Sequence, residues 1–428
     1  MNVRSDRLSN GLQLVHAEVP DTKMVALCIL YNVGARNEDP NHTGWAHLLE
    51  HLMFEGTELV PDYDSRIQFC GGENNAFTNN DFTSFYVTVP HEHAETAFFL
   101  EADRMEGLTL DEQSVRVQKQ VVIEEFKQRF MSQPYGDVQH LIRSLAYRVH
   151  PYRWPTIGVR PSHIRTATPE ALRAFYHHHY RPDNAILAVA GAITWDETRQ
   201  LAEKHFGQQM DAGRLQHADS MTWGLRNPQK QFGNPLIQCE PPQQRLRRKT
   251  VHRNVPMDMI AMAWHMADHF SPEFYVCDVI TDLFAAGQSG RLAQHLISEQ
   301  HLFNQIDAYI TGSTDAGLVV IEGRLNPGVT LTQAEAAIWR EADLLKTKTV
   351  SDYEMEKVRN RFESDRVWST INPVNVAVSL AQQTLYNTTP DDEIRRYRAI
   401  SANDVRRVAR RILTRKNCSV LYYKGQQV

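Results

Sequence analysis

The sequence has no apolar run long enough to cross a membrane. Its longest apolar stretch, residues 185–193, has the length of a buried strand, whereas a spanning helix needs about 20 residues. Residues 1–7 carry basic side chains with no apolar segment behind them, so we expect no signal peptide in this sequence. We therefore predict no membrane span and a cytoplasmic location.

Cysteine is scarce, and two common glycine motifs are absent. The five cysteines form no C-x-x-C pair, which argues against a disulfide scaffold and against a cysteine zinc site. This usage fits a reducing compartment. The glycine-containing segments also lack the G-x-G-x-x-G and G-K-[ST] patterns, which excludes a dinucleotide or P-loop site of the usual kind.

The chain also lacks a strong excess of one charge. Lys and Arg number 46 and Asp and Glu number 51, a net charge of −5, which excludes a generic nucleic-acid binder. With 42% hydrophobic and 23% charged residues, the composition is that of a folded globular protein. A length of 428 residues predicts more than one domain.

Apolar periodicity is lost in a stretch rich in Gln, Pro, Asn and Arg, which indicates a linker at residues 208–244. Similar capped-helix-to-strand segments begin at Thr168 and at Ser401, an offset of 233 residues, which favours an internal duplication. We therefore predict two homologous α+β domains, 1–207 and 245–428. Each is expected to be a mainly antiparallel sheet with helices packed on one face.

The segment most informative about chemistry is residues 43–56, which predicts a helix capped by Thr43 and stopped by Gly56. Its H-x-x-E-H pattern places His47 and His51 one turn apart on one helix face, so that two imidazoles can converge on a single cation. Glu50 shares that face and can act as a base toward a water. The alternative is a solvated polar helix face without a metal.

A zinc site needs a third protein ligand, and a second helix expected at about 111–132 offers one. An apolar stripe on that helix is interrupted by the adjacent carboxylates Glu124 and Glu125. Periodicity alone does not decide which of the two points inward, and exposure of both is the default expectation.

Several segments resemble the M16 metallopeptidases, a family that includes pitrilysin, insulin-degrading enzyme and the mitochondrial processing peptidase. The resemblance spans the chain and is strongest up to about residue 195. It is carried by the following segments: NVGARNE at 32–38, HLLEHLMFEGT at 47–57, GGENNAFTNNDFTSFY at 71–86, VVIEE at 121–125, HPYRWPTIG at 150–158 and YRPDNA at 180–185.

The resemblance implies one Zn²⁺ per chain, with Glu125 rather than Glu124 as its third ligand and Glu50 as the catalytic base. Gln118 stands where the family often has a supporting Glu. Asn75 and Ala76 match positions at which an edge strand binds the substrate backbone by β-augmentation. For Asn75, a turn residue that holds a tight bend is an equally good interpretation.

The second half departs from the family pattern. Active members carry an Arg on a helix and a Tyr seven residues later, and the pair helps to hold substrate and the tetrahedral intermediate. Ile297 and Asn304 stand at these positions here and cannot replace the lost charge and donor. Arg291 matches a family position with a structural role.

These inferences lead to a zinc-dependent endopeptidase that acts on peptides or unfolded segments. Relatives of this length form half of a clamshell. We therefore expect a heterodimer with a homologous M16-like subunit that supplies the missing Arg and Tyr, or otherwise a homodimer. The alternative from another functional class is a non-catalytic scaffold subunit of a larger complex.

Overall fold

The computed structural model describes residues 2–207, 237–311 and 314–425. The chain divides into two units, and neither is a continuous segment. Unit 1 comprises Met1–Phe126, Trp154–Ile237 and Val367–Thr389, and unit 2 comprises Lys127–Arg153, Gln238–Arg366 and Pro390–Val428. Most of the predicted linker, residues 208–236, lies outside the described residues. The boundaries expected at 207 and 245 stay a prediction.

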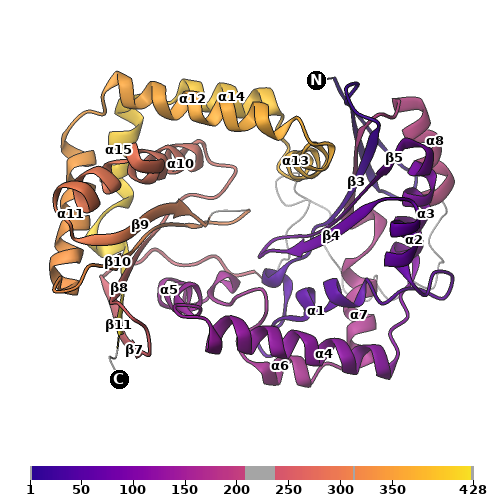
Figure 1. Cartoon of the computed structure of the whole chain (residues 1–428), viewed down its shortest axis with the longest axis horizontal. Helices are drawn as coiled ribbons and strands as arrows, with labels where there is room; N and C mark the ends of the chain where they lie inside the picture. The colour runs from indigo at the N-terminus through magenta and orange to yellow at the C-terminus, as the bar shows by residue number, and fades with distance from the viewer. Residues whose placement is uncertain (1, 208–236, 312–313, 426–428) are drawn as a thin grey trace. The chain divides into compact units, whose positions relative to one another are not determined.

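Unit 1 is built on a six-stranded sheet with the strand order β1-β2-β6-β3-β5-β4. Figure 1 labels its strands β3, β4 and β5. The pair β2 and β6 is parallel, and the other neighbours are antiparallel. The central strand β3 is buried at all but its first residue, because helices cover both of its faces. The strands are β1 (Val3–Arg7), β2 (Gln13–Glu18), β3 (Met24–Tyr31), β4 (Glu73–Thr78), β5 (Thr83–Pro90) and β6 (Ala185–Gly191).

Two sets of helices cover this sheet. Helix α3 packs on β3 and β5, and α8 packs on β2. Helix α13, from far along the sequence, lies against β2, β3 and β6, where Ala377 and Leu380 join an apolar cluster with Cys28 and Ala188. The helices of unit 1 are α1 (Trp45–Leu52), α2 (Tyr63–Phe69), α3 (Ala94–Glu106), α4 (Glu112–Lys127, in this unit up to Phe126), α6 (Pro161–Arg165), α7 (Pro169–His179), α8 (Trp195–Phe206) and α13 (Pro373–Leu385), with the short turns η1 (Ala35–Asn37), η2 (His91–His93) and η5 (Pro182–Asn184).

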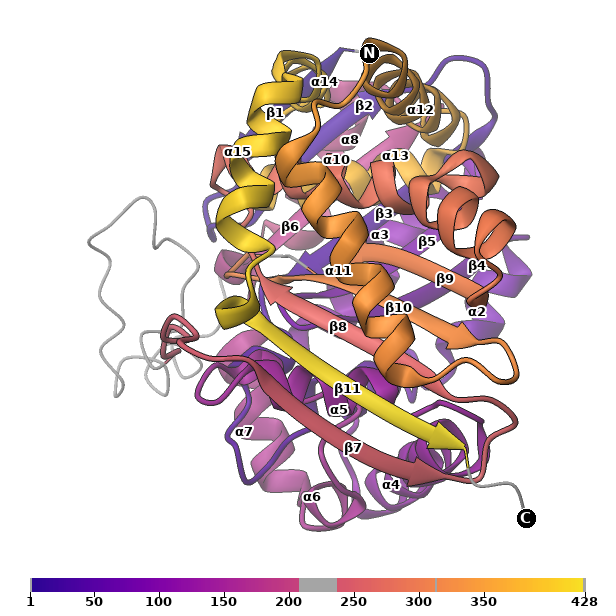
Figure 2. The same ribbon diagram turned by 90° about the vertical axis from the view of Figure 1, so that its left-hand side faces the viewer.

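Unit 2 is built on a five-stranded sheet with the order β7-β11-β8-β10-β9 (Figure 2). Its parallel pair is β7 and β11, so it repeats the arrangement β2-β6-β3-β5-β4 of unit 1, in agreement with an internal duplication. The strands are β7 (Arg247–Arg253), β8 (Met259–His265), β9 (Phe303–Ile310), β10 (Leu318–Leu325) and β11 (Cys418–Gly425).

The sheet of unit 2 is also covered on both faces. Helices α10, α11 and α15 share one apolar cluster with Trp264 and Ile321, whereas α5 packs on the other face through Leu141 and Ile142 against Ala261. The helices of unit 2 are α5 (Val138–Ala146), α10 (Pro272–Ala285), α11 (Leu331–Thr347), α12 (Asp352–Ser369, in this unit up to Arg366), α14 (Pro390–Ala399) and α15 (Ala402–Ile412), with the short helices η3 (Gln128–Ser132), η4 (Pro151–Arg153), η7 (Gly287–Ser289), η8 (Ala293–Glu299) and η9 (Arg415–Asn417).

The predicted α+β class with two sheet-plus-helix halves is confirmed. Each sheet carries, in addition, one helix on its second face, and that helix comes from the other half of the sequence. Helix α5 begins at Val138 and packs in unit 2, and α13 begins at Pro373, 235 residues later, and packs in unit 1. Among the described residues, no helix combines the length and apolar character that crossing a membrane requires.

Candidate metal centre

Helix α1 brings the two histidines of the H-x-x-E-H motif together. Its apolar residues, among them Leu48 and Leu52, are buried, which fixes the rotation of this short helix against the rest of unit 1. His47 and His51 project from its other side, and their rings lie 4.8 Å apart between centroids. Both side chains are partly exposed, so the pair is accessible to a ligand.

The start of α1 differs from the sequence prediction. The expected Thr43 cap is wrong, because Gly44 occupies the cap position with φ 92° and the Thr43 hydroxyl instead pairs with His163 Nδ1 at 2.8 Å. The carboxylate of Glu38 takes over the capping role and accepts hydrogen bonds from the Gly44 and Ala46 N–H groups at 2.8 and 2.9 Å. Burial raises the pKa of Glu38 to about 8, against the opposing effect of these N–H groups. The helix also ends at Leu52, before Gly56.

Helix α4 supplies a carboxylate to the two imidazoles. Glu125 Oε2 lies 3.6 Å from His47 Nε2 and 3.6 Å from His51 Nε2. One ligand atom from each of the three residues lies within 4.8 Å of the others, and no other such group of three occurs within the described parts of the chain. Glu124 is exposed and is not part of this group.

The spacing of these three atoms suits a small divalent cation. Two ligands at about 2.1 Å from a tetrahedral zinc are separated by about 3.4 Å, close to the two distances observed here. Two imidazoles and one carboxylate are also a common zinc ligand set, and three protein ligands leave a fourth position open. The residues present therefore fit a zinc ion.

Glu50 lies on α1 beside this cluster and is held by the end of strand β4. Thr78, the last residue of β4, donates a hydrogen bond from Oγ1 to Glu50 Oε2 at 2.5 Å. Burial raises the pKa of Glu50, and the hydrogen bond from Thr78 and the proximity of His51 oppose that shift. A carboxylate with a raised pKa and one oxygen held by a hydrogen bond is suited to accept and return a proton.

A second threonine supports this contact from behind. The hydroxyl of Thr83 is buried and donates to the Val33 carbonyl at 2.9 Å, while its oxygen lies 3.3 Å from Thr78 Oγ1. Because the Thr83 proton is committed to Val33, the Thr78 proton is left for Glu50. Sequence reasoning did not single out Thr78 or Thr83, since no local pattern links Thr78 to a residue 28 positions earlier.

Gln118 lies at the edge of the cluster, on α4. Its side-chain amide N–H donates to Glu55 Oε1, and the Gln118 side chain is one of the groups that raise the pKa of His51. Burial lowers the pKa of His51, but the neighbouring Glu125, Glu50 and Gln118 outweigh it and raise the pKa overall. Gln118 thus lies beside a candidate ligand.

Asn75 and Ala76 lie on strand β4, at the edge of the sheet in unit 1. They pair with Tyr86 and Phe85 of β5, and no strand covers the other side of β4 within the described residues. Asn75 is thus a strand residue rather than a turn residue. Its side-chain oxygen accepts a hydrogen bond from the Ala76 N–H at 2.8 Å.

The residues that stand in place of the expected Arg and Tyr lie in unit 2. Ile297 on η8 packs against the apolar cluster of that unit, and Asn304 on β9 is exposed. Arg291 is engaged with Glu354 on α12, with contacts of 2.7 and 3.0 Å. Its guanidinium lowers the pKa of Glu354 to about 2.

Comparison with known proteins agrees with the resemblance described above. Residues 14–159 match the family model "Insulinase (Peptidase family M16)", and residues 166–362 match "Peptidase M16 inactive domain". "Zinc protease PqqE" of Helicobacter pylori is 26% identical over 408 residues, which cover 94% of this chain and 88% of the relative. "Uncharacterized zinc protease YmxG" of Bacillus subtilis is 25% identical over 414 residues, covering 95% and 94%.

The solved structures support the same assignment at the level of the fold. A crystal structure of a protease from Helicobacter pylori superposes with a TM-score of 0.90, at 24% identity, and the match covers 99% of this chain and 100% of that one. Two models of one family account for most of the sequence, and the relatives match across both halves. The chain belongs to peptidase family M16.

Proposed function

We propose that this chain is a zinc-dependent endopeptidase that cleaves peptides or unfolded polypeptide segments. The observation that carries the proposal is the convergence of His47, His51 and Glu125 on one point, with Glu50 beside them. Catalytic zinc sites use three protein ligands and leave one position for water or substrate. The names of the relatives, both called zinc proteases, support the same reaction class.

Each residue has a distinct role in this proposal. His47, His51 and Glu125 would hold the Zn²⁺ ion, which would supply a Lewis acid for the scissile carbonyl and for an attacking water. Glu50 accepts the proton of the attacking water and returns it to the leaving amine. Thr78 holds Glu50 Oε2, which leaves Oε1 to take the proton in this proposal.

Strand β4 is the proposed binding edge for the substrate. An extended peptide can add to its open side as a further strand, bound through main-chain hydrogen bonds that make little demand on sequence. Because Thr78 ends β4 and contacts Glu50, a peptide that follows β4 toward Thr78 passes the proposed base. Only an extended chain can pair in this way, which favours peptides and unfolded segments as substrates.

Metal content and activity of single variants test the proposal. His47→Ala should abolish zinc binding, whereas Glu50→Gln should retain one zinc per chain and lose peptidase activity, since it removes a base without removing a ligand. Glu125→Gln should lose zinc and its neighbour control Glu124→Gln should not. Stoichiometric zinc in His47→Ala, or zinc loss confined to Glu124→Gln, would show that the ligand set is wrong.

A homologous subunit is the proposed partner. Ile297 offers neither a charge nor a donor in place of the Arg, and Asn304 offers only a short amide in place of the Tyr phenol, whereas losing one oxyanion donor typically costs about 3–4 kcal/mol. A second identical chain has the same deficiency, so the proposal favours a heterodimer whose other subunit supplies both groups. A quenched peptide assayed with the chain alone and with its homologous partner distinguishes the cases, because full activity of the isolated chain contradicts the divided site.

The competing candidate is a non-catalytic scaffold subunit, and the description "Peptidase M16 inactive domain" is the observation that favours it. That match covers residues 166–362 and contains none of the four proposed site residues. The match to this description therefore does not bear on the proposed metal site in unit 1. A chain that binds zinc but cleaves no peptide with or without the partner would support the scaffold role.

A further inference from the structure

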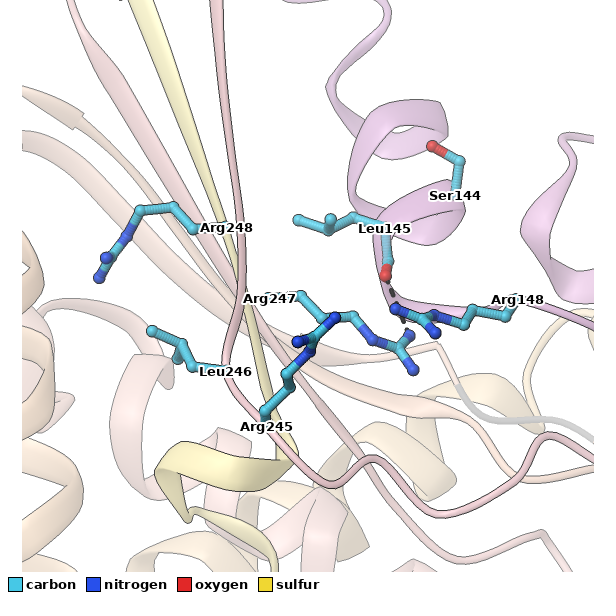
Figure 3. A pocket seen from close by; sticks show the side chains of 7 residues that line it. All are labelled: Ser144, Leu145, Arg148, Arg245, Leu246, Arg247 and Arg248. Carbon is cyan, nitrogen blue, oxygen red and sulfur yellow. Dashed lines mark hydrogen bonds between the residues drawn. The ribbon is translucent and has the colours of Figure 1, made fainter.

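A basic cavity lies in unit 2 where helix α5 ends and strand β7 begins. It has a volume of about 470 Å³, and Figure 3 shows the side chains that surround it. The lining residues are Ser144, Leu145, Arg148, Arg245, Leu246, Arg247 and Arg248. A cavity of this size is within the range of small-molecule sites.

Three of these arginines gather on one side of β7. The guanidinium of Arg247 is nearly buried and donates to the carbonyls of Leu145, at 3.1 Å, and Ala146, at the end of α5. Arg148 and Arg245 extend toward it (Figure 3). Burial lowers the pKa of Arg247, and the two neighbouring arginines lower it further. This is a convergence of like charges, which is unfavourable unless an anion relieves it.

The cluster has too little negative charge of its own. The acidic group that faces Arg247 is Glu240, whose Oε1 lies 3.9 Å from Arg247 Nη2. That carboxylate already accepts hydrogen bonds from the backbone N–H groups of Arg148, Val149 and His150. Within the described ranges no acidic side chain pairs with Arg148 or Arg245, so three guanidinium groups face one carboxylate.

Arg248 shows what a paired arginine on the same strand looks like. It projects away from the cluster (Figure 3), contacts both Glu335 oxygens at 2.7 Å and lies 5.3 Å from the ring centre of Tyr422. The charge of Arg248 is therefore already paired within unit 2. Arg148 and Arg245 have no such partner among the described residues and remain available to a ligand.

We propose that Arg148, Arg245 and Arg247 form a binding site for a phosphate group. A phosphate monoester carries about −1.5 to −2 charges at pH 7 and three acceptor oxygens, which matches the unbalanced charge of the cluster. Arginine binds phosphate through paired N–H donors, and the exposed side chains of Arg148 and Arg245 can both reach a phosphate beside Arg247. The cavity is larger than one phosphate, so free phosphate and the phosphate of a small organic ester share the same recognition chemistry.

Binding should strengthen unit 2, because Arg247 links the site to the last turn of α5. We would titrate the full chain with sodium phosphate, adenosine monophosphate and sodium acetate at constant ionic strength, and follow binding by calorimetry and thermal unfolding. Phosphate should bind saturably with a Kd below about 1 mM and raise the Tm, whereas acetate should not. Tighter binding of the nucleotide than of phosphate would identify an ester as the ligand source, and equal binding would identify free phosphate.

The variants separate a built site from a general charge effect. Arg148→Gln with Arg245→Gln removes two exposed side chains and leaves the structural Arg247 in place, so the protein should fold and bind phosphate at least tenfold more weakly. Lys416→Gln with Lys424→Gln removes the same number of charges from exposed positions outside the cavity, so it is the matched control and should bind as the parent does. The proposal fails if phosphate binding is not saturable, or if the double variant binds within twofold of the control.

Discussion

Thr78 provides the sharpest test of how this fold orients its proposed base. Its hydroxyl donates to Glu50 Oε2 at 2.5 Å, and the Thr83 hydroxyl behind it is committed to the Val33 carbonyl. Thr78→Val preserves the shape and the β-branching of the side chain, so strand β4 should keep its pairing with β5. The substitution therefore removes the hydroxyl donor and leaves the volume of the side chain nearly unchanged.

The expected loss of kcat follows from the strength of the Thr78–Glu50 hydrogen bond. A hydrogen bond to a charged group contributes about 1.5–3 kcal/mol, and each 1.4 kcal/mol corresponds to about a tenfold change in rate. The Thr78 backbone N–H also bonds Glu50 and survives the substitution, which retains part of the orientation. We therefore expect kcat to fall about tenfold.

Steady-state kinetics on a quenched peptide, with zinc content measured in parallel, provides the assay. KM should change less than twofold, since the main chain of β4 is intact, and zinc should stay at one per chain. Thr78→Ser is the matched control and should recover most of kcat because it keeps the hydroxyl. Unchanged kcat in a zinc-loaded Thr78→Val protein, or equal losses in the Val and Ser variants, would refute the positioning role.

Three further predictions concern the framework around the site. Leu380→Ala on α13 should cost about 2–5 kcal/mol of the free energy of unfolding and reduce hydrogen-exchange protection in β3 and β6, and loss of protection in β8 instead would contradict the packing. Glu38→Ala leaves N–H groups at the start of α1 without their buried acceptor and should destabilise unit 1 by about 1–3 kcal/mol, measured by urea unfolding. The pKa of Glu354 is depressed from 4.5 to about 2, so its ion pair with Arg291 stabilises the fold above pH 4.5 and is lost as the pH falls toward 2. Arg291→Gln should accordingly cost about 1–2 kcal/mol at pH 7, allowing for solvent screening, and almost nothing near pH 2, and a pH-independent difference would contradict this assignment.

Local patterns in the sequence predicted much of the fold and the core of the candidate site. The spacing of His47 and His51 is meaningful because a helix has 3.6 residues per turn, and the structure does bring both to one side of α1. The repeated helix-to-strand segments likewise predicted two similar halves, which the matching strand orders confirm. The choice of Glu125 came from family resemblance, since periodicity left Glu124 open.

Contacts between segments far apart in the sequence could not be predicted from local patterns. The apolar faces of α5 and α13 are visible in the sequence, but either helix could cover either sheet, and only tertiary packing decides that each joins the sheet of the other half. The same holds for Glu38, which replaces Thr43 as the cap of α1, and for Thr78, which reaches Glu50 across 28 positions. A hydrogen bond requires two groups within about 3 Å, and that proximity is set by how strands and helices pack rather than by the spacing of residues along the chain.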